Sequence, residues 1–184
     1  MAGSTAEVAQ AVGEELARDG SQVDILPLDQ IHSLEGYTGV VVGAPLILGW
    51  HRDALRFLRK HRRDFERIPL AVFAMALSLT KTGEMSLVGV PVTIDENLLK
   101  APGNQGKLNF RERYAKFSNY LAPILKAIHP VKPVSIGFFC GRLEYGRLKV
   151  WAVLFVMLVI RARAGDQRNW PAIRAWAAGL LFGQ

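Results

Sequence analysis

The chain has 184 residues, of which 50% are hydrophobic and 21% are charged, and its formal net charge at pH 7 is +7. This length and hydrophobic content suit one folded domain with a sizeable core and exclude a disordered chain. The basic surplus favours anionic partners such as nucleotides, nucleic acid, an acidic membrane surface or acidic substrates. Because Cys140 is the single cysteine, an internal disulfide and a metal site built from several cysteines are excluded.

The first element is predicted to be a helix that starts at a small polar turn. Gly3, Ser4 and Thr5 form this turn, and the run from Ser4 to Glu7 fits a capping box. Apolar residues then recur at every fourth position, namely Val8, Val12 and Leu16. Such a turn can hold a phosphate, because its N–H groups point outward, the helix dipole favours an anion and the hydroxyls add donors. An ordinary helix cap is the alternative interpretation.

Strands and helices are predicted to alternate along the rest of the chain. Strands are expected at 22–26, 39–44, 69–79 and 133–140, and helices at 52–65, at 110–128 and from an N-cap at Asn169. Pro123 should kink or split the second of these helices. Residues 80–108 have no clear periodicity, which is typical of a functional or mobile loop. The alternation predicts an α/β fold, a doubly wound parallel sheet with helices on both faces, in a single domain over 1–184.

Ligands of such sheets bind beyond the carboxyl ends of the strands. Loops leave those ends at 43–50, at 77–82 and from Gly141 onward, and the turn at 3–5 is expected at the same edge. An anion-binding turn beside an apolar, glycine-rich loop with Trp50 suggests a flat aromatic ligand that carries a phosphate, which is the shape of flavin mononucleotide (FMN). An ordinary connection is the alternative for the loop at 43–50.

Other chemistry is not predicted. His32, His51, His61 and His129 do not have the spacing of metal ligands, so no metal site is expected. Cys140 lies at a strand end and is expected in the core rather than as a nucleophile. No grouping of Ser, His and Asp stands out, so no side chain is predicted to be catalytic.

Several segments of the sequence resemble flavodoxins, and more specifically the flavodoxin-type, menaquinone-dependent protoporphyrinogen oxidases. The run at 3–9 is similar to the flavodoxin phosphate loop and first helix. The segments that resemble the oxidase family are 39–45, 48–51, 57–61, 141–147 and the pair Gly165-Asp166. The resemblance covers most of the chain outside 80–108, and it depends on the order and spacing of these segments.

The resemblance implies a non-covalent FMN that passes electrons from a porphyrinogen to a quinone or another acceptor, with no catalytic side chain. It implies that Gly3, Ser4 and Thr5 hold the phosphate. One side of the isoalloxazine ring would be lined by Ala44, Pro45, Leu46, Ile47, Leu48, Gly49 and Trp50. Its pyrimidine edge would be approached by Ser78, Leu79 and Thr80. Trp50 is expected either to stack on the ring or to be a core or exposed residue.

The sequence departs from the family at three places. The first strand and the Ser or Thr at the head of the phosphate loop are missing, so we expect the true start to lie upstream. The segment 80–108 is inserted where neighbours of the flavin are expected, and the link from Gly165 to the last helix is short. Two alternatives to an enzyme therefore stay open: a flavodoxin-like electron carrier, and a domain without cofactor that serves in membrane or protein interactions.

An apolar segment and a basic segment bear on location. Residues 150–160 are eleven consecutive apolar residues with basic flanks. As a helix they would span about 16 Å, against ~30 Å for the hydrocarbon core, so a transmembrane span is not expected. Internal or homo-oligomeric burial, and contact of 147–163 with a membrane surface or an apolar substrate, stay open. No signal peptide is recognised, so we expect a cytoplasmic protein, alternatively peripheral on the inner face of the cell membrane.

The segment 52–67 carries seven Lys and Arg residues against three acids. Such a face is usually solvated, and contact with anionic lipid or porphyrin propionates is the alternative. Nucleic acid is not an expected partner, because the aromatic residues that stack on bases are not interleaved with the cations.

Overall fold

The computed structural model describes residues 3–46, 49–81, 89–103, 107–143, 165–180 and 182. Four parallel strands form the main sheet in the spatial order β1-β2-β6-β4. Their bounds are Val40–Pro45 (β1), Leu70–Ala76 (β2), Val92–Ile94 (β4) and Ser135–Cys140 (β6). The predicted α/β class with a parallel sheet is therefore confirmed.

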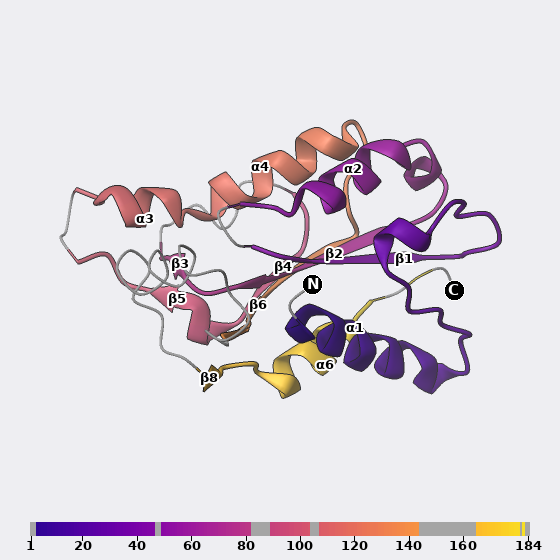
Figure 1. Cartoon of the computed structure of the whole chain (residues 1–184), viewed down its shortest axis with the longest axis horizontal. Coiled ribbons are helices and arrows are strands. Elements are labelled where there is room, and N and C mark those ends of the chain that lie inside the picture. Colours follow the sequence, from indigo (N-terminus) through magenta and orange to yellow (C-terminus); the bar gives the residue numbers. More distant parts are fainter. Residues whose placement is uncertain are drawn as a thin grey trace.

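Helices cover both faces of this sheet (Figure 1). One layer contains α2 (Arg52–Lys60), α3 (Phe110–Tyr114) and α4 (Phe117–Ile128), and the other contains α1 (Gly3–Leu16) and α6 (Trp170–Ala178). Every residue of β2 is buried, and successive side chains enter opposite layers. Val72 packs with the α2 and α4 layer, whereas Phe73 packs with α1 and α6. A strand buried on both faces explains the continuous apolar run in the sequence.

The predicted strand at 22–26 is wrong. These residues are irregular, and the side chains of Ile25 and Leu26 are 40% and 48% exposed. In the part of the chain that the structure describes, residues 22–26 have no hydrogen-bonded strand partner, since β1 pairs with β2 alone and the segment does not pair with the other edge of β1. Alternating residues favour a strand only where such a partner exists. The expected first strand before Met1 stays a prediction.

The described part of 80–108 contains regular structure, which corrects the expectation of a loop over these residues. It contains β4, which pairs with β6, and β5 (Leu99–Lys100), which pairs with β3 (Leu79–Thr80). A short 3₁₀ turn, η5 (Glu96–Leu98), joins them. Strands of two or three residues are too short to leave a periodic pattern, which is why the sequence did not reveal them.

Pro123 does not split the predicted helix at 110–128. It lies inside α4, and the break is at residues 115–116. The side-chain amide of Asn119 donates to the Arg113 carbonyl oxygen at 2.6 Å, and the Ala115 carbonyl oxygen accepts from the Thr80 N–H at 2.9 Å. These bonds occupy carbonyls that would otherwise continue the helix. The N-cap at Asn169 is confirmed, since its Oδ1 accepts from the Ala172 N–H at 3.2 Å.

Candidate functional site

The carboxyl ends of the parallel strands define one edge of the sheet. Leu46, Gly49 and Trp50 follow β1, residues 77–78 follow β2, and Gly141 and Arg142 follow β6. The start of α1 lies at the same edge, because Arg142 Nη1 is 4.0 Å from the Glu7 carboxylate in the second turn of that helix. The structure therefore brings the turn at 3–5 to the edge from which the strand loops leave, as predicted.

The first turn of α1 offers hydrogen-bond donors that the helix itself does not use. Because the helix begins at Gly3, the N–H groups of its first residues have no acceptor within the helix. Thr5 Oγ1 is buried and has no hydrogen-bond partner among the described residues. A buried hydroxyl without a partner costs about 1–3 kcal/mol unless another group binds it. The residues present thus fit an anionic group such as a phosphate at this helix start.

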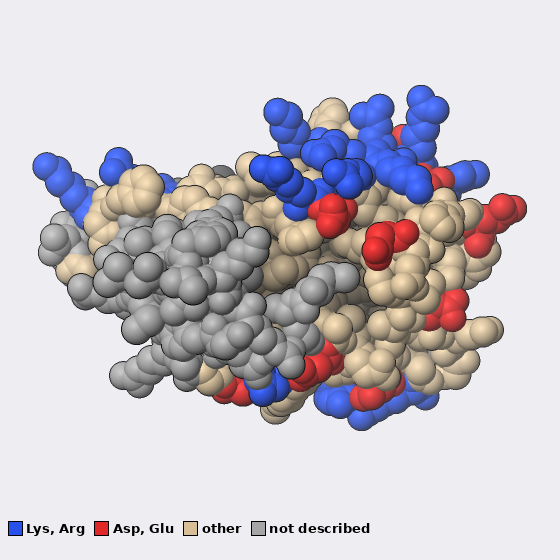
Figure 2. All heavy atoms as spheres, in the orientation of Figure 1, with Lys and Arg blue, Asp and Glu red and all other residues tan. Residues whose placement is uncertain are grey.

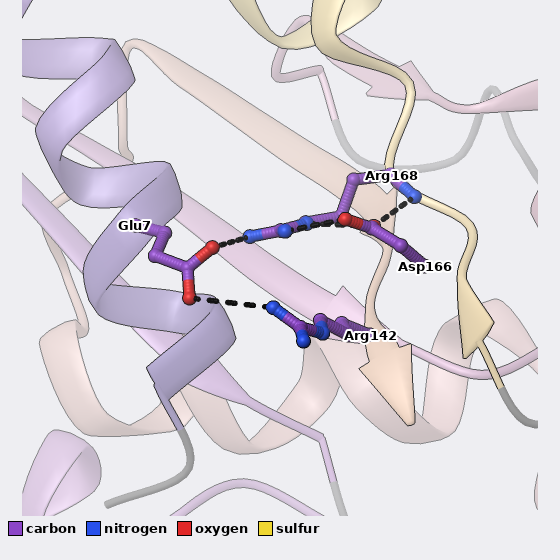
Figure 3. A network of polar contacts seen from close by, with 4 residues as sticks. All are labelled: Glu7, Arg142, Asp166 and Arg168. Atoms are coloured by element: carbon purple, nitrogen blue, oxygen red, sulfur yellow. Dashed lines mark hydrogen bonds and ion pairs between the residues drawn. The ribbon is translucent and has the colours of Figure 1, made fainter. Parts of the chain in front are cut away.

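The predicted capping box is wrong. Ser4 is the second residue of α1 rather than its cap, and the Glu7 carboxylate does not return to the backbone. It accepts instead from Arg168 Nη1 at 2.5 Å (Figure 3). Glu7 therefore ties the helix to a segment more than 150 positions away in the sequence.

Arg168 is the centre of the polar network drawn in Figure 3. Its side chain is only 4% exposed, and its guanidinium donates to both oxygens of Asp166, at 2.7 Å and 2.5 Å. It also lies 4.4 Å from the centre of the Trp170 ring. The hydrogen bond from Arg168 holds the pKa of the Asp166 carboxyl below its usual value, and the same bond raises the pKa of Arg168. The network fixes the first two turns of α1 against β8 (Gly165–Asp166).

The predicted ring-contacting residues divide into two groups by burial. The buried ones, at most 7% exposed, are Ala44, Leu46, Trp50, Leu79 and Thr80. Those that reach the surface in part are Pro45, Gly49 and Ser78. Ile47 and Leu48 lie outside the described residues. Direct contact with a flat ligand is thus open to the second group, whereas the side chains of the first group are enclosed in the fold.

Trp50 takes the core role that the sequence left open for it. The indole is 7% exposed, and its Nε1 donates to the Tyr120 carbonyl oxygen at 2.5 Å. Thr80 also forms hydrogen bonds within the fold. Its hydroxyl donates to the Glu112 carbonyl oxygen, and its N–H donates to the Ala115 carbonyl oxygen, both at 2.9 Å. These two side chains join the strand-end loops to α3 and α4.

Comparison with known families agrees with this architecture. A family model described as a flavodoxin domain matches residues 1–169. The chain belongs to the flavodoxin domain family. Searches of curated proteins and of solved structures gave no match. Among the described residues of this flavodoxin domain, no helix is long and apolar enough to cross a membrane, and the apolar segment 150–160 lies outside them.

Tyr114 is a site residue that the sequence interpretation missed. Gly49 has a φ of 105°, and a Cβ atom there would lie 4.0 Å from the Tyr114 hydroxyl oxygen. The Tyr114 side chain is 39% exposed, and its ring meets that of Tyr120 edge to face at 6.2 Å. A partly exposed aromatic ring therefore stands beside the loop after β1. Nothing in the sequence singled it out within the predicted helix at 110–128.

Asp95, which follows β4, places a buried carboxylate beside Cys140 at the end of β6. Asp95 is 2% exposed and accepts from the N–H groups of Asn97 and Cys140, at 3.1 Å and 3.3 Å, and from the Asn169 amide at 3.4 Å. Burial, together with the nearby Asp95, raises the pKa of Cys140 to about 12. Cys140 is 1% exposed, so its predicted place in the core is confirmed.

We expect the native protein to resist thiol alkylation. At pH 8 a thiol with a pKa of about 12 is almost entirely protonated, whereas an unfolded cysteine with a pKa of about 8.5 is substantially ionised. Iodoacetamide should therefore label native Cys140 at least ~1,000-fold more slowly than the urea-unfolded chain, as followed by mass spectrometry. Labelling at comparable rates in both states would contradict this burial.

Proposed function

We propose that this flavodoxin domain binds FMN non-covalently and serves in electron transfer. One observation carries the proposal: the buried Thr5 hydroxyl has no hydrogen-bond partner among the described residues. It lies in the first turn of α1, at the edge of the sheet where the parallel strands end. A phosphate bound there accepts from the hydroxyl and the first-turn N–H groups. Bound FMN supplies the redox chemistry, and the chain binds and orients it.

Gly3, Ser4 and Thr5 hold the FMN phosphate. The residues assigned to the ring are chosen by their exposure. Pro45, Gly49 and Ser78 contact the ring, and Tyr114 borders it beside Gly49. The buried residues Ala44, Leu46, Trp50, Leu79 and Thr80 support these contacts from below. The sequence predicts that Ile47 and Leu48 also line the flavin ring.

We extend the proposal to an FMN-dependent oxidoreductase that takes electrons from a porphyrinogen-like substrate and passes them to a quinone-like acceptor. The support is the resemblance of the segments at 39–51 and 141–147 to flavodoxin-type protoporphyrinogen oxidases. Anaerobic oxidation of protoporphyrinogen by FMN-loaded protein with a quinone tests it. Loaded protein that leaves the porphyrinogen unchanged, yet exchanges electrons with a reductase, is instead an electron carrier.

Titration with FMN and with riboflavin tests the phosphate site directly, because riboflavin lacks the phosphate. Substituting Thr5→Val removes one hydroxyl donor to a charged group, which is worth about 1.5–3 kcal/mol. The FMN dissociation constant should therefore rise at least ~10-fold, measured by quenching of flavin fluorescence. Riboflavin affinity should stay unchanged. The exposed Thr38, changed to Val, is the matched control and should alter neither affinity.

The outcomes separate the parts of the proposal. Wild-type protein that binds neither flavin rejects the FMN proposal and leaves the cofactor-free interaction domain. Equal weakening of FMN and riboflavin in the Thr5→Val variant shows that Thr5 acts on the fold of α1 rather than on the phosphate.

A further inference from the structure

One side of α2 and the turn that follows it are strongly basic. The apolar side of the helix is already used, since Ala54, Phe57 and Leu58 are buried in the core. The remaining surface carries cations, which we call the α2 basic surface: Arg52, Arg56, Arg59, Lys60, Arg62, Arg63 and Arg67. All seven are exposed, and Figure 2 shows blue side chains gathered along the upper edge of the molecule over α2.

Most of this charge is not neutralised within the fold. Asp53 lies 3.4 Å from Arg56 and 3.5 Å from His51, and Asp64 lies 3.7 Å from Arg67. The other five cations, Arg52, Arg59, Lys60, Arg62 and Arg63, form no ion pair with any described residue. With seven cations against three acids, residues 52–67 have a net charge of +4, out of +7 for the whole chain.

We propose that the α2 basic surface docks this protein on a bilayer that contains anionic phospholipids. Six of the seven cations are arginines, whose guanidinium groups bind phosphate oxygens through paired hydrogen bonds. Because the apolar side of α2 is in the core, the contact is electrostatic, without insertion of the helix. Such docking is reversible and weakens as salt screens the charges. The proposal stands on this charge pattern and does not depend on flavin binding.

The shape of the surface favours a bilayer over other polyanions. None of the exposed large hydrophobic residues lies within 52–67, so the surface lacks the apolar anchors that usually dominate protein interfaces. Its aromatic residues, Phe57 and Phe65, are buried and cannot stack on the bases of a single strand. The helix lies flat on the sheet and contacts α4, so it does not project as a groove-binding helix does (Figure 1).

Co-sedimentation of the full chain with vesicles tests the proposal. We expect binding to vesicles of 70% phosphatidylcholine and 30% phosphatidylglycerol at low salt, and little binding to pure phosphatidylcholine or at 0.5 M salt. Each basic residue near an anionic surface contributes roughly a five-fold factor in partitioning. The triple variant Arg59→Gln, Lys60→Gln, Arg63→Gln should therefore bind ~100-fold more weakly.

A charge-matched variant serves as the control. Lys81, Lys100 and Lys107 are exposed residues outside the α2 basic surface, and changing all three to Gln removes the same charge. This variant should lose less than about five-fold. Equal losses in both triples, no binding by the wild type, or equal binding to neutral vesicles would each overturn the proposal. Tighter binding of duplex DNA than of vesicles, abolished by the first triple, would assign the surface to nucleic acid instead.

Discussion

Replacing Arg168 with methionine is expected to lower the free energy of unfolding by about 3 kcal/mol. The guanidinium is 4% exposed and is bonded to Asp166 and Glu7, so its loss removes the hydrogen-bonded cation of both carboxylates and leaves only the more distant Arg142, 4.0 Å from Glu7. The expected loss lies at the low end for a broken buried ion pair, because both carboxylates are nearly half exposed and can turn to water. Urea denaturation followed by circular dichroism measures the change.

Arg174 provides the matched control, because it also forms ion pairs with glutamates of α1. From α6 it lies 3.2 Å from Glu14 and 3.6 Å from Glu15 of α1, but its side chain is 37% exposed. Arg174→Met should therefore lose about 1 kcal/mol, because the pair with Glu14 is a surface ion pair and the buried Glu15 keeps Arg18 at 2.8 Å. Equal losses in the two variants would show that burial of Arg168 adds nothing to the link between α1 and β8.

The effect of Arg168 should also depend on pH. Because Arg168 lowers the pKa of Asp166 in the folded state, the stability from this pair is present above the unfolded pKa of about 4. This stability is lost as the pH falls through the pKa of Asp166 in the folded protein, which is lower than the unfolded value. The difference in stability between wild type and Arg168→Met should therefore shrink below about pH 4, whereas a difference that stays constant would mean that the loss comes from packing on Trp170 alone.

The elements that could be predicted are those with strong local signals. Residues 39–44, 69–79 and 133–140 are apolar runs between turn residues, and each contains a strand of the sheet, of which β2 and β6 are buried and β1 is partly buried. Asn169 followed by Pro171 identified the start of α6, because both residues act within the first turn of a helix. Local chemistry sufficed at these positions, since each signal and its effect lie within a few residues.

The elements that could not be predicted depend on partners distant in the sequence. The segment 22–26 alternates like a strand, yet it has no strand beside it among the described residues. Conversely, residues 92–94 form a strand because β6 offers them an open edge, and three residues carry no pattern that reveals this. Arg168 and Glu7 are 161 positions apart, so no spacing in the sequence marks their contact.

The candidate site shows the same division. The position of the strand loops and of the α1 start at one edge follows from the parallel topology, and it was predictable. Which side chains of those loops remain accessible depends on packing against α3 and α4, and this packing could not be predicted from the sequence. Trp50 illustrates this, since the feature that made it a candidate, a large aromatic ring in a glycine-rich loop, also makes it the residue that fills the core there.

Replacing Phe73 with alanine is expected to have the largest effect, a loss of about 3–5 kcal/mol. The ring is 1% exposed between the sheet and the α1 and α6 layer, and it meets the Trp176 ring edge to face at 6.1 Å. It also covers Gly43 of the neighbouring strand, where a Cβ atom would overlap the ring. Truncation leaves a cavity beside Trp176 and Gly43, which the surrounding core closes only in part. Urea denaturation measures the loss.

A double-mutant cycle with Gly43 distinguishes this packing from a general loss of hydrophobicity. Gly43→Ala alone should cost about 1–3 kcal/mol, because the added methyl group displaces the Phe73 ring. In the Phe73→Ala background the same methyl group enters the cavity and replaces a flexible glycine in a strand, so it should be neutral or stabilising. The two substitutions are thus expected to couple by at least ~1 kcal/mol. Additive effects would contradict the inference, because they would mean that the ring can leave Gly43 without loss.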